Sequence, residues 1–301
     1  RIPDGADTIA IQENTQAKGA TVFIDKAEKP GRYIRRAGLD FRAGDVLLRE
    51  GMKLSPARLS LAASMGLPTL PVRKRPKVAI IASGDELVAP GEAVPEGGIV
   101  SSNNLGIAAI VKGAGGEPVD LGIAKATRAA LADMFAQAAN CDVVVTSGGA
   151  SVGDHDLVRP VLNDHGVKLD FWKIAMRPGQ PLIFGRKGKQ CYLGLPGNPV
   201  SSLVCSQVYL VPLISSLLGA ETSSNIFDGV LGRDLPENDE REEYMRAVFE
   251  DGRLHPFDNQ DSSILSSLAR AEALLIRPAR AVEAKAGDAW RYIPVISGAD
   301  L

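Results

Sequence analysis

The sequence is poor in cysteine and in uninterrupted apolar runs, and each absence excludes a class of protein. Only three cysteines occur in 301 residues, and they are Cys141, Cys191 and Cys205. Their odd number, wide spacing and apolar surroundings argue against a disulfide framework or a zinc site and indicate a reducing compartment. No run reaches the ~18 to 20 consecutive apolar residues of a membrane span, and the N-terminus lacks a signal-peptide pattern. These absences predict a cytoplasmic protein with no membrane partner.

A strong charge of one sign is also missing. The formal net charge is −2, whereas binding to a nucleic-acid backbone requires a concentrated cationic excess. The dense basic stretch at residues 73–77 precedes an expected strand and is interpreted as a solvated linker. We therefore expect no nucleic-acid partner. The chain begins at Arg1 without an initiator Met, and we interpret it as a truncated or incomplete form of a longer sequence.

Two catalytic signatures are absent as well. The sequence has no Ser-His-Asp arrangement with a nucleophile elbow and no G-x-G-x-x-G fingerprint. What is present is an ordinary globular composition, 45% hydrophobic and 23% charged, in a chain long enough for two or three cores. We expect more than one domain.

Three compositional regions follow one another along the chain. Residues 1–54 alternate short apolar and polar segments with Gly and Pro between them, which predicts a small β-rich domain with strands near 20–24 and 45–48. From 76 to 219, strands alternate with helices, which predicts a three-layer α/β domain with a mostly parallel sheet. Residues 220–301 return to short alternating segments and predict a separate β-rich domain.

A helical segment connects the first two regions. Residues 55–75 form a linker in which Ser55 is the expected N-cap, Pro56 the first helical residue and Gly66 the stop. For the rest of the chain we expect helices at 104–112, 127–139 (with Thr127 as N-cap), 157–164, 200–218 and 264–271, and strands at 117–121 and 142–146.

Three glycine-rich loops, each directly behind a short apolar run, are the most informative feature that is present. They occupy residues 83–86, 147–153 and 195–199. Buried parallel strands read as continuous Val- and Ile-rich runs, and ligands of open α/β sheets bind beyond the carboxyl ends of the strands. The sequence therefore predicts that these loops form one site.

The second loop is suited to an oxyanion. Gly148, Gly149 and Ser151 place backbone N–H groups at the start of a helix, as phosphate-binding loops do. A turn that merely needs positive φ is the alternative. Asp154 and Asp156 favour a ligand, because two carboxylates beside an anion require a bridging cation. Mg²⁺ binds through one or two carboxylates plus substrate phosphates and is the natural bridge.

Carboxylates also follow the first expected strand. Asp85 and Glu86 stand directly behind Ser83 and Gly84. Individually they can be acids that complement a helix dipole. Two acidic loops at one edge of a predicted sheet favour a metal or general-base role instead.

Two cations precede a Pro-Gly turn. Lys173 and Arg177 are four residues apart in a stretch that we expect to be extended, so alternation places both side chains on the same side. This pattern suits a polyanionic ligand, and two surface charges are the alternative.

The third loop contains two prolines. In Pro196-Gly197-Asn198-Pro199 the prolines fix the backbone, Gly197 permits close approach, and Pro199 belongs to the first turn of a helix. A rigid strand-to-helix corner is the alternative, and it is compatible with a binding role.

Together these blocks resemble the signature blocks of the molybdopterin molybdotransferase (MoeA) family. The resemblance rests on residues 83–87, 147–156, 173–181 and 194–201, which occur in order and with the expected intervals. It extends to Gly5-Ala6-Asp7, Arg246, His255-Pro256 and Gln260-Asp261-Ser262, so it covers nearly the whole chain.

The resemblance implies an enzyme of molybdenum-cofactor synthesis. Such an enzyme binds adenylylated molybdopterin, cleaves the adenylyl phosphate bond with Mg²⁺ and ligates molybdate to the dithiolene. The resemblance also implies a homodimer with a central α/β domain, a small β domain, a linker domain and a C-terminal β-barrel. It makes a molybdopterin adenylyltransferase a candidate partner.

Individual residues match family positions. Glu86 and Asp156 match acidic residues near the metal and the cleaved phosphate, and Lys173 and Arg177 match basic residues that hold anions, with Arg in place of the more usual Lys. We therefore expect Glu86 and Asp156 to bind the metal, and Asp156, Glu86 and Lys173 to be catalytic. The expected substrate-binding residues are Ser83, Gly84, Asp85, Gly148, Gly149, Ser151, Arg177, Pro196, Gly197, Asn198, Pro199 and Ser201.

Departures from the family pattern keep two alternatives open. Ala126-Thr127 stands where an acidic pair is usual, Ser263 stands where Gly is usual, and the family normally has a Thr-Gly-Ala loop between Ile2 and Pro3. Roughly a hundred further residues normally precede that loop, more than half of a typical domain. One alternative is an adenylyltransferase or another nucleotide-dependent enzyme acting on the same pterin. The other is a non-catalytic binding or scaffolding homologue, a role that the related domain of gephyrin has in anchoring receptors.

Overall fold

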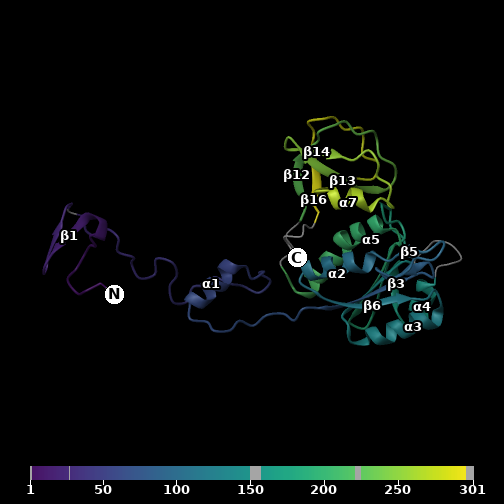
Figure 1. Ribbon diagram of the computed structural model, residues 1–301, viewed down its shortest axis with the longest axis horizontal. Coiled ribbons are helices and arrows are strands. Elements are labelled where there is room, and N and C mark those ends of the chain that lie inside the picture. Colours follow the sequence, from purple (N-terminus) through teal and green to yellow (C-terminus); the bar gives the residue numbers. More distant parts are fainter. Residues whose placement is uncertain (1, 27, 150–156, 221–224, 296–301) are drawn as a thin grey trace. The chain divides into compact units, whose positions relative to one another are not determined.

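The computed structural model describes residues 2–26, 28–149, 157–220 and 225–295 (Figure 1). The chain divides into two compact units, residues 1–49 and 50–301. Each unit is described by itself.

The first unit is a small β structure. It contains a 3₁₀ turn, η1 (Gln12–Asn14), and an antiparallel hairpin of β1 (Thr15–Lys18) and β2 (Thr21–Ile24). None of its described residues is buried. The hairpin therefore has no hydrophobic core among the described residues of its own unit.

The strand expected at residues 45–48 does not form, so that prediction is wrong. Gly44 has a φ of +92°, and the Asp45 carboxylate accepts the backbone N–H of Arg42 at 2.8 Å. This closes a turn, and no strand pairs with the residues that follow it. An apolar pattern in one segment does not show whether a second strand is present to form hydrogen bonds with it.

The second unit begins with the predicted linker helix. Helix α1 (Pro56–Ser64) starts at Pro56, and the Ser55 hydroxyl accepts the backbone N–H of Arg58 at 3.3 Å. Gly66, just beyond the helix, has a φ of +81°. The capping pattern of the sequence is thus confirmed at both ends.

A six-stranded sheet forms the centre of the second unit. Its strand order is β6-β3-β7-β11-β10-β8, in which β6, β3, β7 and β11 are parallel to one another and β10 is antiparallel to both of its neighbours. The mostly parallel sheet expected from the sequence is confirmed. The strands are β3 (Lys77–Ser83), β6 (Glu117–Ala124), β7 (Val143–Ser147), β8 (Lys168–Phe171), β10 (Ile183–Lys187) and β11 (Gln190–Leu195).

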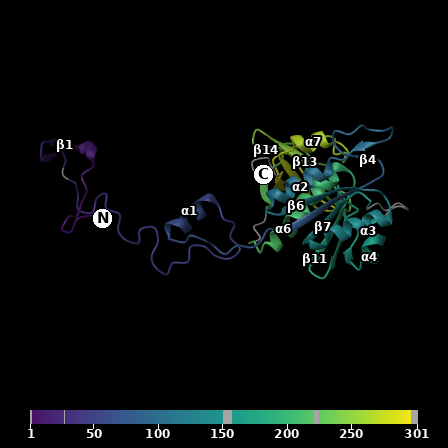
Figure 2. The same cartoon turned by 60° about the horizontal axis from the view of Figure 1, so that its bottom comes forward.

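Helices cover both faces of this sheet (Figures 1 and 2). Alternate residues of β3 enter opposite cores, because Val78 and Ile80 pack with α2 and α5 whereas Ala79 and Ile81 pack with α3 and α4. The result is the predicted three-layer arrangement. The helices are α2 (Asn103–Gly113), α3 (Arg128–Gln137), α4 (Val158–Asp164), α5 (Pro199–Cys205) and α6 (Val211–Leu217), and η2 (Ala138–Asn140) extends α3.

A π-helical turn, η3 (Ser206–Leu210), joins α5 to α6. Together they form the helical segment Pro199–Leu217, which is the one segment of the described chain long and apolar enough, by composition, to cross a membrane. Val200, Val204 and Leu210 of this segment lie fully inside the core against the sheet, and burial raises the pKa of the Cys205 thiol to about 12. The segment is therefore placed as a core helix.

A second sheet forms the C-terminal part. Its order is β12-β16-β15-β13-β14, and a bridge between Leu231 and Leu254 joins the end of β12 to β14, so the sheet closes on itself. This agrees with the expected barrel-like domain. The strands are β12 (Phe227–Val230), β13 (Glu242–Glu250), β14 (Arg253–Pro256), β15 (Ala273–Arg277) and β16 (Ala289–Pro294), with α7 (Leu265–Arg270) between β14 and β15.

Strand β13 connects the two sheets in two ways. Strand β9 (Met176–Arg177), which follows β8 in the chain, pairs in parallel with the start of β13. Strand β13 also has two different faces: Met245 and Ala247 pack inside the closed sheet, whereas Tyr244 packs against the core of the α/β part. One strand therefore belongs to both hydrophobic cores.

Candidate active site at the strand ends

The carboxyl ends of five strands lie along one edge of the central sheet. Ser83, Ala124, Ser147 and Leu195 end the four parallel strands in register, and Phe171 ends β8 at the level of Leu193 and Val145 through β10. The three glycine-rich loops follow β3, β7 and β11, which are neighbours in the sheet. The sequence prediction that these loops meet at one edge is confirmed.

Close backbone approach explains the glycines of the second loop. Gly148 has a φ of +85°, and a Cβ atom there would lie 2.5 Å from the carbonyl oxygen of Ser83. Gly149 has a φ of +67°, and its Cβ would lie 3.0 Å from a methyl group of Val158. The turn therefore requires glycine for steric reasons.

The second and third loops touch each other. A Cβ at Gly197 would lie 3.6 Å from the Cα of Gly148, and the N–H of Gly148 donates to the carbonyl of Leu195 at 3.2 Å. Asn103, the first residue of α2, bridges them, because its side-chain N–H₂ donates to Ser147 Oγ and to the carbonyl of Gly197, both at 2.8 Å. The sequence analysis did not identify Asn103 as a site residue, because in the sequence it stands only at the start of an expected helix.

The first loop carries two carboxylates with different contacts. Asp85 Oδ1 accepts the backbone N–H of Ala126 at 2.9 Å, which ties this loop to the turn after β6. Glu86 is exposed, and its carboxylate folds back beside Gly84, where a Cβ would lie 2.6 Å from either oxygen. Asp85 thus has a structural bond, whereas Glu86 presents its charge at the edge. The adjacent Ser83 is buried.

The turn after β6 contains Ala126 and Thr127, which stand where the resemblance leads us to expect an acidic pair. The Thr127 hydroxyl accepts the backbone N–H of Ala130 at 3.2 Å and caps α3, as the sequence predicts. Where the family usually has an acidic pair, this chain therefore has a neutral cap and a backbone donor to Asp85.

The third loop is bonded to the C-terminal part. The side-chain N–H₂ of Asn198 donates to Ser262 Oγ at 2.8 Å, and the N–H of Val200 donates to the Ser262 carbonyl at 3.2 Å. Pro196 and Ser201 are buried, and Pro199 is the first residue of α5. The loop is therefore a rigid corner, as its prolines suggest, and Gly197 and Asn198 are its exposed residues.

A buried arginine lies close to this connection. Arg246 is 1% exposed, it exchanges two backbone hydrogen bonds of 3.0 Å with the Gln260 side chain, and one of its terminal nitrogens donates to the Asn259 carbonyl at 3.3 Å. Burial lowers the pKa of Arg246. The Ser263 N–H and hydroxyl both donate to Asp261 and hold the pKa of that carboxyl below its usual range.

The two cations of the predicted extended stretch are separated by the structure. Bends at Trp172 and Ala175 interrupt the chain between β8 and β9, so alternation does not relate Lys173 to Arg177 and that expectation is wrong. Lys173 is exposed, and its Nζ lies 4.4 Å from the centre of the Trp172 ring. The stretch cannot remain extended because β9 pairs with β13 rather than with the central sheet.

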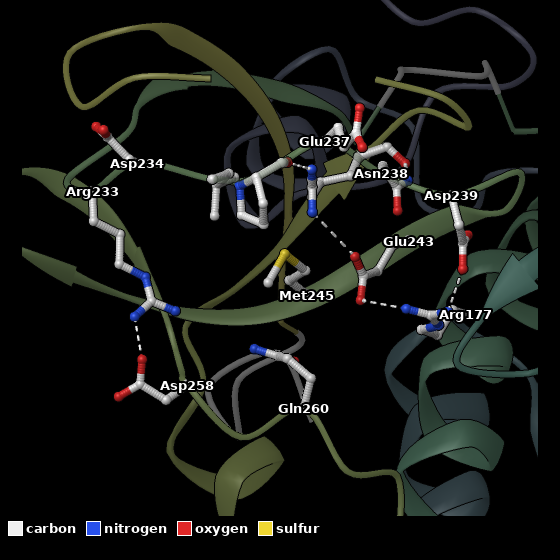
Figure 3. Close-up of a pocket in the computed structure, with 13 residues that line it drawn as sticks. Arg177, Arg233, Asp234, Glu237, Asn238, Asp239, Glu243, Met245, Asp258 and Gln260 are labelled. Carbon is white, nitrogen blue, oxygen red and sulfur yellow. Dashed lines mark hydrogen bonds and ion pairs between the residues drawn. The ribbon is translucent and has the colours of Figure 1, made fainter. Parts of the chain in front are cut away.

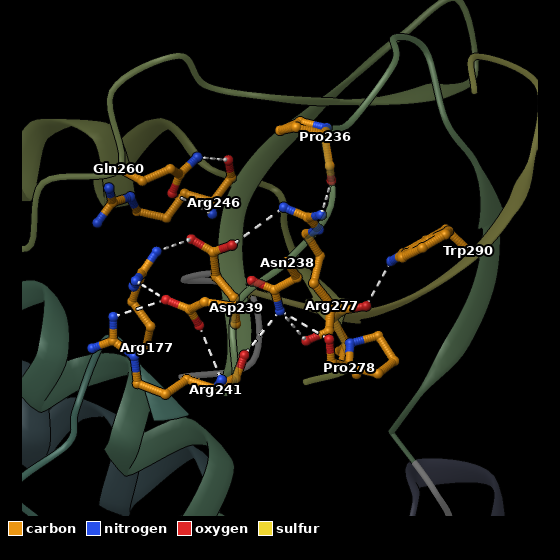
Figure 4. Close-up of polar contacts among 12 residues, drawn as sticks. Arg177, Pro236, Asn238, Asp239, Arg241, Arg246, Gln260, Arg277, Pro278 and Trp290 are labelled. Atoms are coloured by element: carbon orange, nitrogen blue, oxygen red, sulfur yellow. Dashed lines mark hydrogen bonds and ion pairs between the residues drawn. The ribbon is translucent and has the colours of Figure 1, made fainter. Parts of the chain in front are cut away.

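Arg177 enters a network of charges at the mouth of the closed sheet. Its guanidinium pairs with Asp239 and lies 3.8 Å from Glu243, which in turn lies 3.5 Å from the buried Arg277 (Figure 4). Arg241 donates to Asp239 from its side chain and its backbone, and these bonds hold the Asp239 pKa below its usual range. Sequence reasoning missed these carboxylates, because they lie more than sixty residues from Arg177 in the chain.

Arg177, Asp239, Glu243 and Arg277 line a cavity of about 600 Å³ (Figure 3). Residues 233–239 form one wall, Glu243 and Met245 of β13 form another, and Arg177 and Arg277 also line the cavity. Most of the charged groups in Figure 3 are paired with one another rather than directed at open space.

Two predicted site residues, Ser151 and Asp156, lie outside the described residues. Within the described ranges, no three His, Cys, Asp or Glu side chains gather as a metal site would require. The edge therefore consists of a glycine-lined backbone cradle, the exposed Glu86 and Lys173, a first loop tied down by the Asp85 carboxylate, and second and third loops held by neutral hydrogen bonds.

Comparisons with known proteins identify the family. Residues 1–66 match the model of the MoeA N-terminal region (domain I and II), residues 79–216 match a probable molybdopterin binding domain, and residues 228–295 match the MoeA C-terminal region (domain IV). The chain is 36% identical to the molybdopterin molybdenumtransferase of Nostoc sp. over 92% of its own length. It spans 66% of that relative's length.

Two further likenesses agree. The chain is 35% identical to molybdopterin molybdenumtransferase 2 of Mycobacterium tuberculosis, covering 95% of this chain and 73% of that protein. Its fold is similar to the crystal structure of the molybdopterin biosynthesis MoeA protein of Pyrococcus horikoshii OT3, with a TM-score of 0.78 and 27% identity over 97% of this chain and 72% of that one. With the signature loops gathered at one sheet edge, the chain belongs to the molybdopterin molybdenumtransferase (MoeA) family.

Proposed function

We propose that this chain is the main part of a molybdopterin molybdotransferase, an enzyme that inserts molybdate into adenylylated molybdopterin and releases AMP. The observation that carries the proposal is the convergence of the three glycine-rich loops at one edge of the central sheet. Relatives that are 35–36% identical over more than nine-tenths of this chain bear that enzyme's name.

The cradle at Gly148 and Gly149 suits the phosphate groups of the substrate. Neither residue has a side chain that would keep an oxyanion away from the backbone, and the close approach to Ser83 together with the Gly148 N–H bond to the Leu195 carbonyl fixes the turn before the ligand arrives. Lys173 is exposed at the same edge and would offset negative charge that grows on the leaving phosphate. Asn198 and Gly197, which the Ser262 and Asn103 contacts hold in place, would line the pterin and molybdate side.

Magnesium suits the carboxylate chemistry of this edge. Asp85 and Glu86 offer hard oxygen donors beside the cradle, and Mg²⁺ usually binds through one or two carboxylates together with substrate phosphates and waters. Glu86 and Asp156 would hold it, and Asp85 would keep the first loop in place through Ala126. The ion would neutralise charge on the phosphate that is cleaved.

Arg177 would assist anion binding from the side of the C-terminal sheet. Asp239 and Glu243 share its charge, so it would act as a weaker anion ligand than Lys173. Arg177 and Lys173, which the sequence analysis expected to hold anions in the same way, would thus have different strengths as anion ligands.

The remaining proposals concern assembly and location. We propose a cytoplasmic homodimer with a molybdopterin adenylyltransferase as a partner. The first unit, none of whose described residues is buried, supports dimerisation, because apolar side chains such as Phe23 and Ile24 are left half exposed. Analytical ultracentrifugation of the full-length protein tests it, and a monomer at micromolar concentration would contradict it.

AMP release from adenylylated molybdopterin by full-length protein with Mg²⁺, with and without molybdate, tests the activity. We expect molybdate-dependent release and formation of active cofactor. Asp156→Ala should abolish the release while leaving the fold intact, and Glu86→Gln should reduce it by about 100-fold. The matched control is Glu96→Gln. Glu96 is another exposed carboxylate, ten residues further along the chain, and this variant should leave the rate unchanged.

Two other outcomes would replace the proposal. Tight pterin binding without AMP release would indicate a non-catalytic binding homologue. Formation of adenylylated molybdopterin from nucleotide and pterin would indicate an adenylyltransferase.

A further inference from the structure

Arg177 differs in exposure from the other arginines of its charged network. Its side chain is 42% exposed, compared with 30% for Arg241 and 5% for Arg277. Strand β9 pairs with β13 so that Arg177 and Glu243 are partners in register, and the preceding Met176 is buried in the core of the α/β part. The backbone at Arg177 is therefore held in place, and its guanidinium is the part that can turn toward a ligand.

Three guanidinium groups share two carboxylates in this network (Figure 4). Arg177 and Arg241 both pair with the same oxygen of Asp239, Oδ2, and Arg241 lies 3.0 Å from it. Glu243 lies 3.8 Å from Arg177 through one oxygen and 3.5 Å from Arg277 through the other. Each carboxylate that pairs with Arg177 thus has a second cation.

Both carboxylates would keep a partner if Arg177 turned away. The Arg241 side chain donates to Asp239 Oδ2 at 3.0 Å and its backbone N–H donates to Oδ1 at 2.9 Å, and these two bonds are the main cause of the lowered pKa of Asp239. Glu243 would retain Arg277. Release of Arg177 would therefore leave no buried carboxylate unpaired, and an ion pair between partly exposed groups stabilises a fold only slightly.

Competition for this guanidinium favours one class of anion. A guanidinium forms paired hydrogen bonds with two oxygens of a carboxylate or of a tetrahedral oxyanion, which chloride cannot do. Coulomb attraction to a dianion is about twice the attraction to a monoanion at the same distance. A dianionic oxyanion can therefore replace the Asp239 carboxylate, whereas a monoanion gains nothing over it.

We infer that Asp239 is a selectivity-determining residue of the anion site at Arg177. Asp239 occupies the guanidinium until a tetrahedral dianion displaces it, and Arg241 acts as a positioning residue that then retains Asp239. That the dianion takes part in the reaction, as molybdate or as a phosphate of the substrate, rests on the proposed function. Asp239 and Arg241 lie outside all of the signature blocks of the sequence, so this control of affinity extends the site into the C-terminal part.

Calorimetric titration of the full-length protein with sodium molybdate, and separately with inorganic phosphate, tests the competition without turnover. Asp239→Asn keeps the shape of the side chain without its charge, and it should bind at least one of these dianions about fivefold more tightly than the parent. The dianion with the larger gain identifies the source. The matched control is Asp234→Asn, because Asp234 lines the same cavity but pairs with Lys285. Its affinity should stay within about twofold of the parent.

Double variants test whether the effect passes through Arg177. Asp239→Asn should give no gain when Arg177→Gln is also present. Arg241→Gln should weaken dianion binding about threefold, since Asp239 then depends on Arg177, but by less than about twofold when Asp239→Asn is also present. A merely structural role would weaken binding in each variant and would give no gain in Asp239→Asn.

Chloride tests the selectivity. At constant ionic strength, replacement of gluconate by chloride should weaken dianion binding about threefold in Asp239→Asn and less than about 1.5-fold in the parent, because chloride can occupy only the freed guanidinium. A smaller chloride effect in Asp239→Asn than in the parent would overturn the selectivity.

Two further results would overturn the inference. They are equal affinity of Asp239→Asn and the parent for both dianions, and a gain that persists in Arg177→Gln. If AMP release depends on molybdate but either result is found, the role of Asp239 fails and the proposed function stands. If the affinities change as described but AMP release never depends on molybdate, the proposed function fails and the competition at Arg177 stands.

Discussion

The strand-end edge of the central sheet and the cavity at the mouth of the C-terminal sheet both contain many polar groups, but they use them differently. At the edge, neutral hydrogen bonds from Asn103 and Asn198 hold the second and third loops, and the charges of Glu86 and Lys173 remain exposed. In the cavity, the cations and carboxylates pair with one another (Figure 4). Loops held by neutral hydrogen bonds leave the charged side chains available to a ligand. In the cavity, the charged side chains are neutralised by one another and serve to hold the fold.

The largest effect should come from the backbone of the edge. Gly148→Ala forces a Cβ to within 2.5 Å of the Ser83 carbonyl oxygen at a φ of +85°. We expect a loss of about 3 kcal/mol in the free energy of unfolding and of about 100-fold in AMP release, since the cradle must shift. Urea unfolding and the AMP assay measure these losses.

Gly166→Ala is the control for that change. Gly166 has a φ of +81° but open space around its Cβ position, so only conformational strain of about 1 kcal/mol is expected, with normal activity. Equal destabilisation in the two variants would show that close approach to Ser83 is unimportant.

The cavity should respond in stability rather than in the chemical step. Glu243→Ala leaves Arg277, which is 4% exposed, without its carboxylate partner, and we expect a loss of about 3 kcal/mol in the free energy of unfolding. The double variant Glu243→Leu with Arg277→Met should recover at least half of this loss, because it removes both buried charges. A double variant as unstable as Glu243→Ala would mean that the pairing is not the cause.

A smaller effect is expected from the neutral scaffold. Asn103→Ala removes the donors to Ser147 and to the Gly197 carbonyl, at a cost of about 1 to 2 kcal/mol in unfolding free energy. Loosening of both loops should also lower AMP release by about tenfold. Asn163→Ala, an exposed position in α4, should change neither quantity.

The smallest expected effect is a pH dependence in the cavity network. The Arg241 side chain and backbone hold the Asp239 pKa below its usual value, so Asp239 contributes stability above the ordinary aspartate pKa of about 3.9. That contribution is lost as the pH falls through the lower pKa of the folded state. Urea midpoints of the parent and Asp239→Asn should differ by a constant amount from pH 7 to about 5 and converge below about pH 4. A difference that grows on acidification would contradict the assignment.

Local patterns predicted much of the fold. Ser55, Pro56 and Gly66 set the ends of α1, and Thr127 caps α3, because caps depend on neighbouring residues only. The gathering of three loops at one edge could also be predicted, since the carboxyl ends of adjacent parallel strands lie together.

The failures all depend on distant partners. Val46 and its neighbours have a strand-like pattern but no ladder to join, and Lys173 and Arg177 lose their alternation because β9 pairs with β13. Asp239 and Glu243, which pair with Arg177, and Asn103, which bridges two loops, carry no local signal of these roles. Register and packing between remote segments decide such contacts.

The pairing of β9 with β13 has a consequence for how this molecule can be divided. Composition suggests a domain boundary near residue 220, but a fragment beginning there would contain β13 without Met176 and Arg177. The first residues of β13 would then expose unpaired backbone N–H and C=O groups. Such a fragment would be prone to associate edge to edge, and Tyr244 would lose the apolar surface that covers it. The α/β part and the closed sheet should therefore be kept together when a fragment of this protein is expressed. If one part is exchanged for that of a relative, the residues of the other part that contact it must fit the exchanged part.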